Sequence, residues 1–78
     1  MPVILRHRGH KFFFYSDERS EPPHVHVRSA EKEAKYWLDT VALQWSTGYN
    51  SAELRELEQL ITLNREYLLG RWNEYFGR

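Results

Sequence analysis

Polar and apolar residues alternate strictly over residues 24–28, and this is the clearest structural signal in the chain. Successive side chains of a β-strand point to opposite faces, so His24, His26 and Arg28 share one face while Val25 and Val27 share the other. Two prolines lie directly before the strand, and because they lack backbone N–H groups they place its start outside a sheet interior. The valine face predicts a core, and the histidine face is the first candidate for chemistry.

The residues that follow predict a hairpin. Residues 29–32 favour a tight reversal, and residues 33–38 have the composition of a second strand. A two-residue loop and a four-residue loop give the same register, in which the numbers of paired residues add to 61. A three-residue loop would shift the pairing by one residue and place polar and apolar side chains on the same face. The predicted pairs on the histidine face are His24 with Trp37, His26 with Lys35 and Arg28 with Glu33.

Other strands are weaker predictions. Residues 3–5 favour a short first strand, and residues 11–16, with four consecutive aromatics, favour a strand covered on both faces. Residues 41–45 alternate as a short strand or an extended arm before Gly48.

Residues 51–76 carry apolar side chains at three- and four-residue steps, which predicts a helical segment packed on the sheet. Asn50 and Glu53 match a capping box at its start, and the apolar stripe thins at Asn64 and Arg65, where we expect a bend or break. The predicted fold class is therefore α+β, a small antiparallel sheet of three or four strands packed against a C-terminal helical segment.

Length and composition restrict the function classes. A chain of 78 residues predicts one domain over residues 1–78, and it contains no cysteine for a disulfide or a thiolate zinc site. No stretch resembles a signal sequence or a membrane span, so we expect a cytoplasmic protein with no membrane partner. The 11 basic residues balance the 11 acidic ones, but residues 1–35 hold seven basic and five acidic side chains. This small excess argues against non-specific duplex binding and leaves room for a local phosphate site.

The histidine face has the groups needed for RNA cleavage without a metal. One imidazole of His24 and His26 would take the 2′-hydroxyl proton and the other would protonate the leaving oxygen, the order being open. Lys35, as a third catalytic group, and Arg28 would stabilise the phosphate charge, and Trp37 would stack a base.

Alternatives remain open for these residues. Arg6, His7, Arg8 and Lys11 form either a further phosphate-binding patch or a solvated turn. A His-X-His pair on a strand is also half of a zinc or iron site, but it needs a third protein ligand, so we predict no metal site and no cofactor. The imidazoles of His24 and His26 are otherwise hydrogen-bonded sheet residues stacked on Trp37.

Four motifs together resemble the bacterial family named domain of unknown function 4160: residues 9–16, residues 22–27, residues 32–38 and residues 72–76. The family motif falls on Pro23, His24 and His26, and again on residues 33–35. The resemblance implies the toxin of a type II toxin–antitoxin module, with a small protein antitoxin encoded nearby as its partner.

Three functions follow as hypotheses. The first is a toxin that cleaves RNA with the histidine pair, the second is a non-catalytic module that binds a protein partner with the same face, and the third is a metal-dependent enzyme. A homodimer is also expected as an alternative assembly. A solvent-open cleft holding His24, His26 and Lys35 or Arg28 favours cleavage, whereas a face sealed by Trp37 or residues 12–15 favours the binding module.

Overall fold

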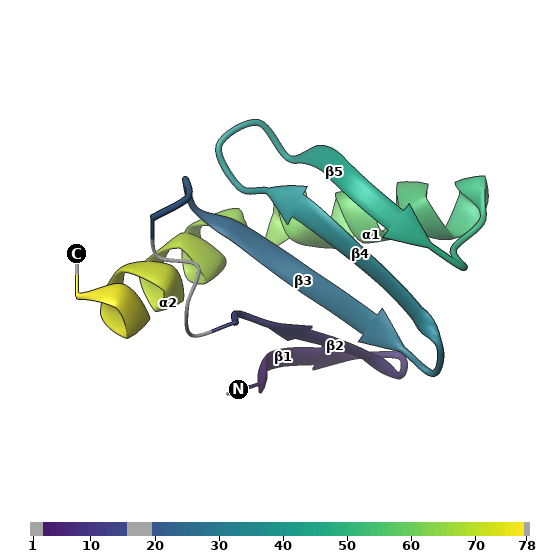
Figure 1. Cartoon of the computed structure of the whole chain (residues 1–78), viewed down its shortest axis with the longest axis horizontal. Helices are drawn as coiled ribbons and strands as arrows, with labels where there is room; N and C mark the ends of the chain where they lie inside the picture. The colour runs from purple at the N-terminus through teal and green to yellow at the C-terminus, as the bar shows by residue number, and fades with distance from the viewer. Residues whose placement is uncertain (1–2, 16–19, 78) are drawn as a thin grey trace.

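The computed structural model describes residues 3–15 and 20–77, which form a five-stranded antiparallel sheet and two helices (Figure 1). The α+β class is confirmed, but the sheet has one strand more than the upper number predicted. The residues at 41–45 are not an arm, because they pair with the preceding strand over its length. The elements are β1 (Val3–His7), β2 (His10–Phe13), β3 (His24–Ser29), β4 (Lys32–Trp37), β5 (Ala42–Thr47), α1 (Ser51–Leu63) and α2 (Arg65–Phe76).

Each strand pairs with the next strand along the chain, so the sheet order is β1-β2-β3-β4-β5. The predicted hairpin register is confirmed, since His24 pairs with Trp37, His26 with Lys35, and Ser29 with Lys32. Its loop is the two-residue turn of Ala30 and Glu31, and Ala30 adopts a positive φ of 56°.

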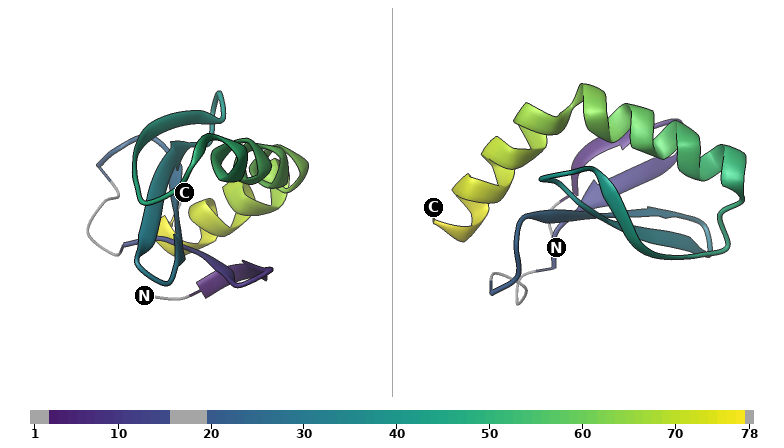
Figure 2. Two further views of the ribbon diagram at one scale, coloured as in Figure 1. Left: turned by 90° about the vertical axis from the view of Figure 1, so that its right-hand side faces the viewer. Right: turned by 90° about the horizontal axis from the view of Figure 1, so that it is seen from above.

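Both helices lie on the same side of the curled sheet, and they cover the valine face (Figure 2). We call the opposite side the helix-free face. The core between the layers includes Val25, Val27 and Tyr36 from the sheet, and Leu57 and Trp72 from the helices, all at most 1% exposed. The prediction that the valine face is a core face is therefore confirmed.

The helical segment breaks where the sequence predicts a break. Asn64 ends α1 and precedes α2, with φ −107° and ψ 16°, and its side-chain amide donates to the Leu60 carbonyl at 2.8 Å. The predicted capping box is also present: Glu53 N–H donates to Asn50 Oδ1 at 2.8 Å, and Asn50 N–H donates to Glu53 Oε1 at 2.9 Å. Two shorter helices can follow the curl of the sheet, which a straight rod of this length could not do.

Candidate functional site

The histidine pair lies on β3, the central strand of the sheet, with His26 on the helix-free face and His24 at the start of the strand, where Trp72 of α2 also reaches it. The ring centroids of the two imidazoles are 5.3 Å apart. Yet His24 is 0% exposed and His26 is 2% exposed. Neither ring lines either of the two surface hollows described below.

Aromatic rings enclose the pair. The Phe13 ring stacks on His26 at 5.6 Å between centroids, and the Tyr15 ring meets it edge-on at 4.4 Å. Trp37 lies 5.7 Å from His24, and Trp72 of α2 lies 4.9 Å from it. Phe13 and Tyr15 thus cover His26 on the helix-free face, and His24, at the start of β3, is closed off by Trp37 and by Trp72 of α2. This arrangement favours a binding module over cleavage.

The polar contacts of the described residues also hold the pair inside the protein. His24 Nδ1 lies 3.0 Å from the Pro22 carbonyl oxygen, and because a carbonyl only accepts, Nδ1 carries the hydrogen. His26 Nδ1 lies 3.6 Å from Glu33 Oε2, which accepts a hydrogen bond from the Tyr15 hydroxyl at 3.2 Å.

Lys35 lies beside the histidines but is itself occupied. Its ammonium donates to Glu21 Oε1 at 2.6 Å and sits 4.8 Å from the centroid of the Trp37 ring. Its side chain is only 8% exposed, so Glu21 supplies the counter-charge that burial requires. The structure therefore brings together His24, His26, Lys35 and Trp37 as the sequence predicts, in a buried cluster rather than an open cleft.

A second feature of the helix-free face is a line of three cations, Arg6, Lys11 and Arg28, which we call the cation row. Arg6 pairs with Lys11 across β1 and β2, and Lys11 pairs with Arg28 across β2 and β3. All three residues are exposed. Within residues 3–15 and 20–77, no ion pair or side-chain hydrogen bond involves any of them. Like charges on directly opposed strand positions repel, so the Arg6–Lys11 and Lys11–Arg28 pairs lower stability, and Glu33, opposite Arg28 on β4, offsets part of this.

An exposed tryptophan shares this face. Trp45 pairs with Lys35 across β4 and β5 and is 40% exposed. A bulge beside Lys35 changes the alternation of β5, so Leu43 pairs with Tyr36 on the helix side. The helix-free face therefore has exposed cations on β1–β3 and an exposed indole on β5.

The turn between β1 and β2 is hollowed. Arg8 and Gly9 both adopt positive φ, 50° and 82°, and they form a two-residue turn between His7 and His10. A surface hollow of about 230 Å³ is lined by Arg6, His7, Arg8, Gly9, His10 and Lys11. Arg8 pairs with Glu56 of α1 at 3.0 Å. Arg6 and Arg8, which the sequence predicts as phosphate-binding residues, both line this hollow, but of the two only Arg8 has an ion pair among the described residues.

A broader depression of about 530 Å³ follows the outer side of α1, lined by Arg55, Glu58, Gln59, Thr62 and Leu63. It lies on the helical layer, away from the histidine pair. Leu63 is 82% exposed there.

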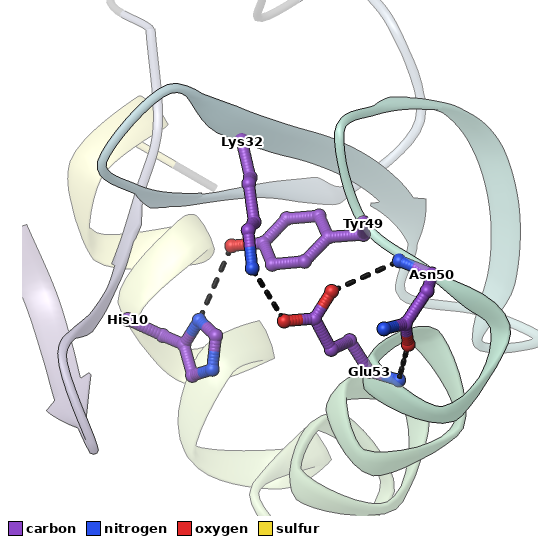
Figure 3. A network of polar contacts seen from close by, with 5 residues as sticks. All are labelled: His10, Lys32, Tyr49, Asn50 and Glu53. Carbon is purple, nitrogen blue, oxygen red and sulfur yellow. Dashed lines mark hydrogen bonds and ion pairs between the residues drawn. The ribbon is translucent and has the colours of Figure 1, made fainter.

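A polar network joins the sheet to the start of α1 (Figure 3). His10 Nδ1 lies 3.2 Å from the Tyr49 hydroxyl, and Lys32 Nζ donates to Glu53 Oε2 at 2.5 Å. The hydrogen bond from Lys32 and that from the Asn50 backbone hold the pKa of Glu53 below its usual value. Burial, helped by the Glu53 charge, raises the pKa of Tyr49 to about 12. We interpret this network as structural, because each member has a partner inside it.

Sequence reasoning missed two residues that shape the helix-free face, Glu21 and Trp45, and it placed Lys11 with Arg6 and Arg8 without its alignment with Arg28. Lys11 enters the cation row through the β1–β2 register, which depends on the turn at Arg8 and Gly9. The bulge that positions Trp45 and the approach of Glu21 to Lys35 leave no periodic signal in the sequence.

Two negative findings concern the described residues alone. In residues 3–15 and 20–77, no three His, Cys, Asp or Glu side chains gather as a metal-binding group. Across the same residues, no helix has the length and apolar character needed to cross a membrane.

Comparison with known proteins identifies the family. No curated protein and no solved structure matches the chain. The model of the family described as domain of unknown function (DUF4160) matches residues 9–73, which include the sheet from His10 onward and most of both helices. The chain therefore belongs to the DUF4160 family.

Proposed function

We propose that this protein binds single-stranded RNA on its helix-free face and does not cleave it with the histidine pair. The observation that carries the proposal is the cation row, three exposed cations on neighbouring strands that form no ion pair among the described residues, with Glu33 at the position opposite Arg28 on β4. Strands lie about 4.8 Å apart, so the three charges form a short positive track. Such a track suits a sugar–phosphate backbone.

Trp45 supplies the second part of the proposed surface. Sequence-tolerant recognition of single strands combines a positive track with aromatic rings on which bases stack. Trp45 offers such a ring on the same face as the cation row. A duplex is a poorer ligand, because the protein carries no net charge and the row offers only three contacts.

The buried histidines then have a supporting role. Phe13 and Tyr15 pack on His26, and the Tyr15 hydroxyl donates to Glu33, whose carboxylate lies near the same imidazole, so the buried pair supports the centre of the face beneath its exposed rim. RNA binding of this kind fits the toxin role that the family resemblance implies, because a protein that sequesters RNA can arrest growth without cleaving it.

Fluorescence anisotropy with a labelled oligouridine of twelve nucleotides tests the proposal. Three phosphate contacts on a single strand predict that log K falls with log salt at a slope of about −2. Arg28→Gln should reduce the slope magnitude by about 0.7, the share of one contact. The matched control is Arg55→Gln, which removes an exposed arginine of α1 and should leave the slope unchanged.

Trp45→Ala should weaken binding by about 5- to 150-fold, since stacking contributes about 1–3 kcal/mol per base. Circular dichroism on each variant separates lost binding from lost folding. Lys11→Gln adds a sharper check, because removing one of three repelling cations should keep or raise the melting temperature while it weakens RNA binding.

Other outcomes would favour the competing hypotheses. Equal losses of RNA affinity from Arg28→Gln and Arg55→Gln, or the absence of saturable RNA binding by the wild type, would overturn RNA binding on this face. Binding of a small protein encoded beside the gene, weakened by Arg28→Gln in the absence of RNA binding, would instead favour the protein-interaction module. RNA fragments on a gel that disappear with His24→Gln/His26→Gln, while that variant stays folded, would favour cleavage.

A further inference from the structure

We infer that the hollow at the β1–β2 turn binds a terminal phosphate monoester, so that the protein prefers RNA ends that carry a phosphate. This inference deepens the proposed RNA binding and rests on it for the identity of the ligand. The hollow is a distinct place on the molecule, since the lining that the described part of the chain contributes comes from residues 6–11.

The charge of the hollow matches a dianion. Arg6, Arg8 and Lys11 bring three positive charges, and among residues 3–15 and 20–77 one acidic side chain pairs with them, Glu56 with Arg8. The difference, three minus one, leaves two positive charges. A terminal phosphate carries about −1.5 to −2 at pH 7 because its second pKa is about 6, whereas an internal phosphodiester carries a single charge.

The shape of the hollow also suits a chain end. Its volume of about 230 Å³ is well above that of a phosphate group but small for a nucleotide strand passing through. The positive φ of Arg8 and Gly9 keeps the turn to two residues, so the side chains on its two flanking strand ends surround one small space.

The hollow and the cation row share residues and are therefore continuous. Arg6 and Lys11 line the hollow and also begin the row that ends at Arg28. A strand whose terminal phosphate enters the hollow can lay its next phosphates along the row. Arg8 belongs to the hollow alone and Arg28 to the row alone, which makes the two functions separable by mutation.

The test compares the same labelled twelve-nucleotide oligouridine with a 5′-phosphate, a 3′-phosphate or hydroxyls at both ends. We expect one phosphorylated end to bind about tenfold more tightly than the hydroxyl form at low salt, as the roughly two additional, partly screened negative charges imply. Arg8→Asn should remove most of this preference. Asparagine is favoured at a positive φ, so this variant should fold. Arg28→Gln should weaken all three RNAs by a similar factor and so preserve the preference.

Each failure is distinguishable. Equal affinity for the three RNAs, or a preference that survives Arg8→Asn, would overturn the inference and leave RNA binding intact. If no RNA binds, a titration with uridine 5′-monophosphate against uridine, followed by amide NMR shifts, decides the matter. Shifts at residues 6–11 with the monophosphate alone would support a phosphate hollow without RNA binding, and no shifts would overturn both proposals.

Discussion

Two buried tyrosines make the protein sensitive to alkali at the level of single residues. Burial, reinforced by the Glu58 carboxylate, raises the pKa of Tyr36 to about 12, and burial with Glu53 does the same for Tyr49. The Tyr36 hydroxyl also donates to the Leu54 carbonyl at 3.1 Å, a contact that its neutral form keeps. The fold thus favours the protonated form of both side chains.

A raised pKa fixes the sign of the pH dependence. An unfolded tyrosine ionises near pH 10.0, so the contribution of both side chains is complete below that pH and is lost as pH rises towards 12. We predict that the free energy of unfolding, measured with urea, falls over this interval. Tyr36→Phe should make the fall shallower. A free energy that is flat from pH 10 to 12 would contradict the assigned burial.

The candidate site was predictable from sequence in its membership but not in its exposure. Alternation alone placed His24, His26 and Arg28 on one face, and the register added Lys35 and Trp37, because the period of a strand is two. Burial of the pair depends on Phe13 and Tyr15, which reach it from another part of the sheet. These contacts follow from the pairing of β2 with β3, which no local pattern in the sequence predicts.

At the scale of elements, the β3–β4 hairpin is strained at one position. Ala30 adopts φ 56° as the first residue of its two-residue turn, a place where glycine is favoured. A side chain in the left-handed region costs about 1–2 kcal/mol. Glycine avoids this cost but loses about 0.5–1 kcal/mol through the entropy of the unfolded chain.

We therefore predict that Ala30→Gly stabilises the protein by about 0.5–1 kcal/mol, the difference between these two effects. Urea denaturation measures it. Ala52→Gly is the matched control, because this exposed alanine lies in the first turn of α1 and its replacement should destabilise the helix. A loss of stability from both substitutions would show that the turn is not strained.

Elements with a local signature were predicted well. The capping box of Asn50 and Glu53, the break at Asn64 and the hairpin register all depend on neighbouring residues, and all three predictions are confirmed. The length of β1 and the status of β5 as a full strand depend on pairing with a neighbour, which explains why the strand count was too low.

For the whole molecule, Trp72 joins the helical layer to the sheet. It is 1% exposed, and its ring lies 4.1 Å from Phe76, 4.9 Å from His24 and 5.2 Å from Phe14 between centroids. Replacing a buried tryptophan by alanine costs about 3–5 kcal/mol, which is comparable to the total stability of a small domain.

We accordingly predict that Trp72→Ala is largely unfolded at room temperature, whereas Trp72→Phe folds with reduced stability. Far-ultraviolet circular dichroism and the urea midpoint of each variant measure this. Tyr75→Ala is the control from the same helix, because Tyr75 is 40% exposed and should tolerate the change. A cooperative transition of wild-type midpoint for Trp72→Ala would contradict the role assigned to this residue.

The sequential order of the sheet determines how the protein can fold during its synthesis. Because every strand bonds to the one before it, each hairpin can close as soon as its second strand leaves the ribosome, with no wait for a distant segment. The helices are made after all five strands, so the nascent sheet exposes its apolar side until Trp72 emerges. The hydrogen bond from the Tyr67 hydroxyl to the Ile4 carbonyl then ties the last helix to the first strand. Slowed translation of the segment that encodes α1 and α2 would prolong the interval in which this apolar side is exposed to other proteins.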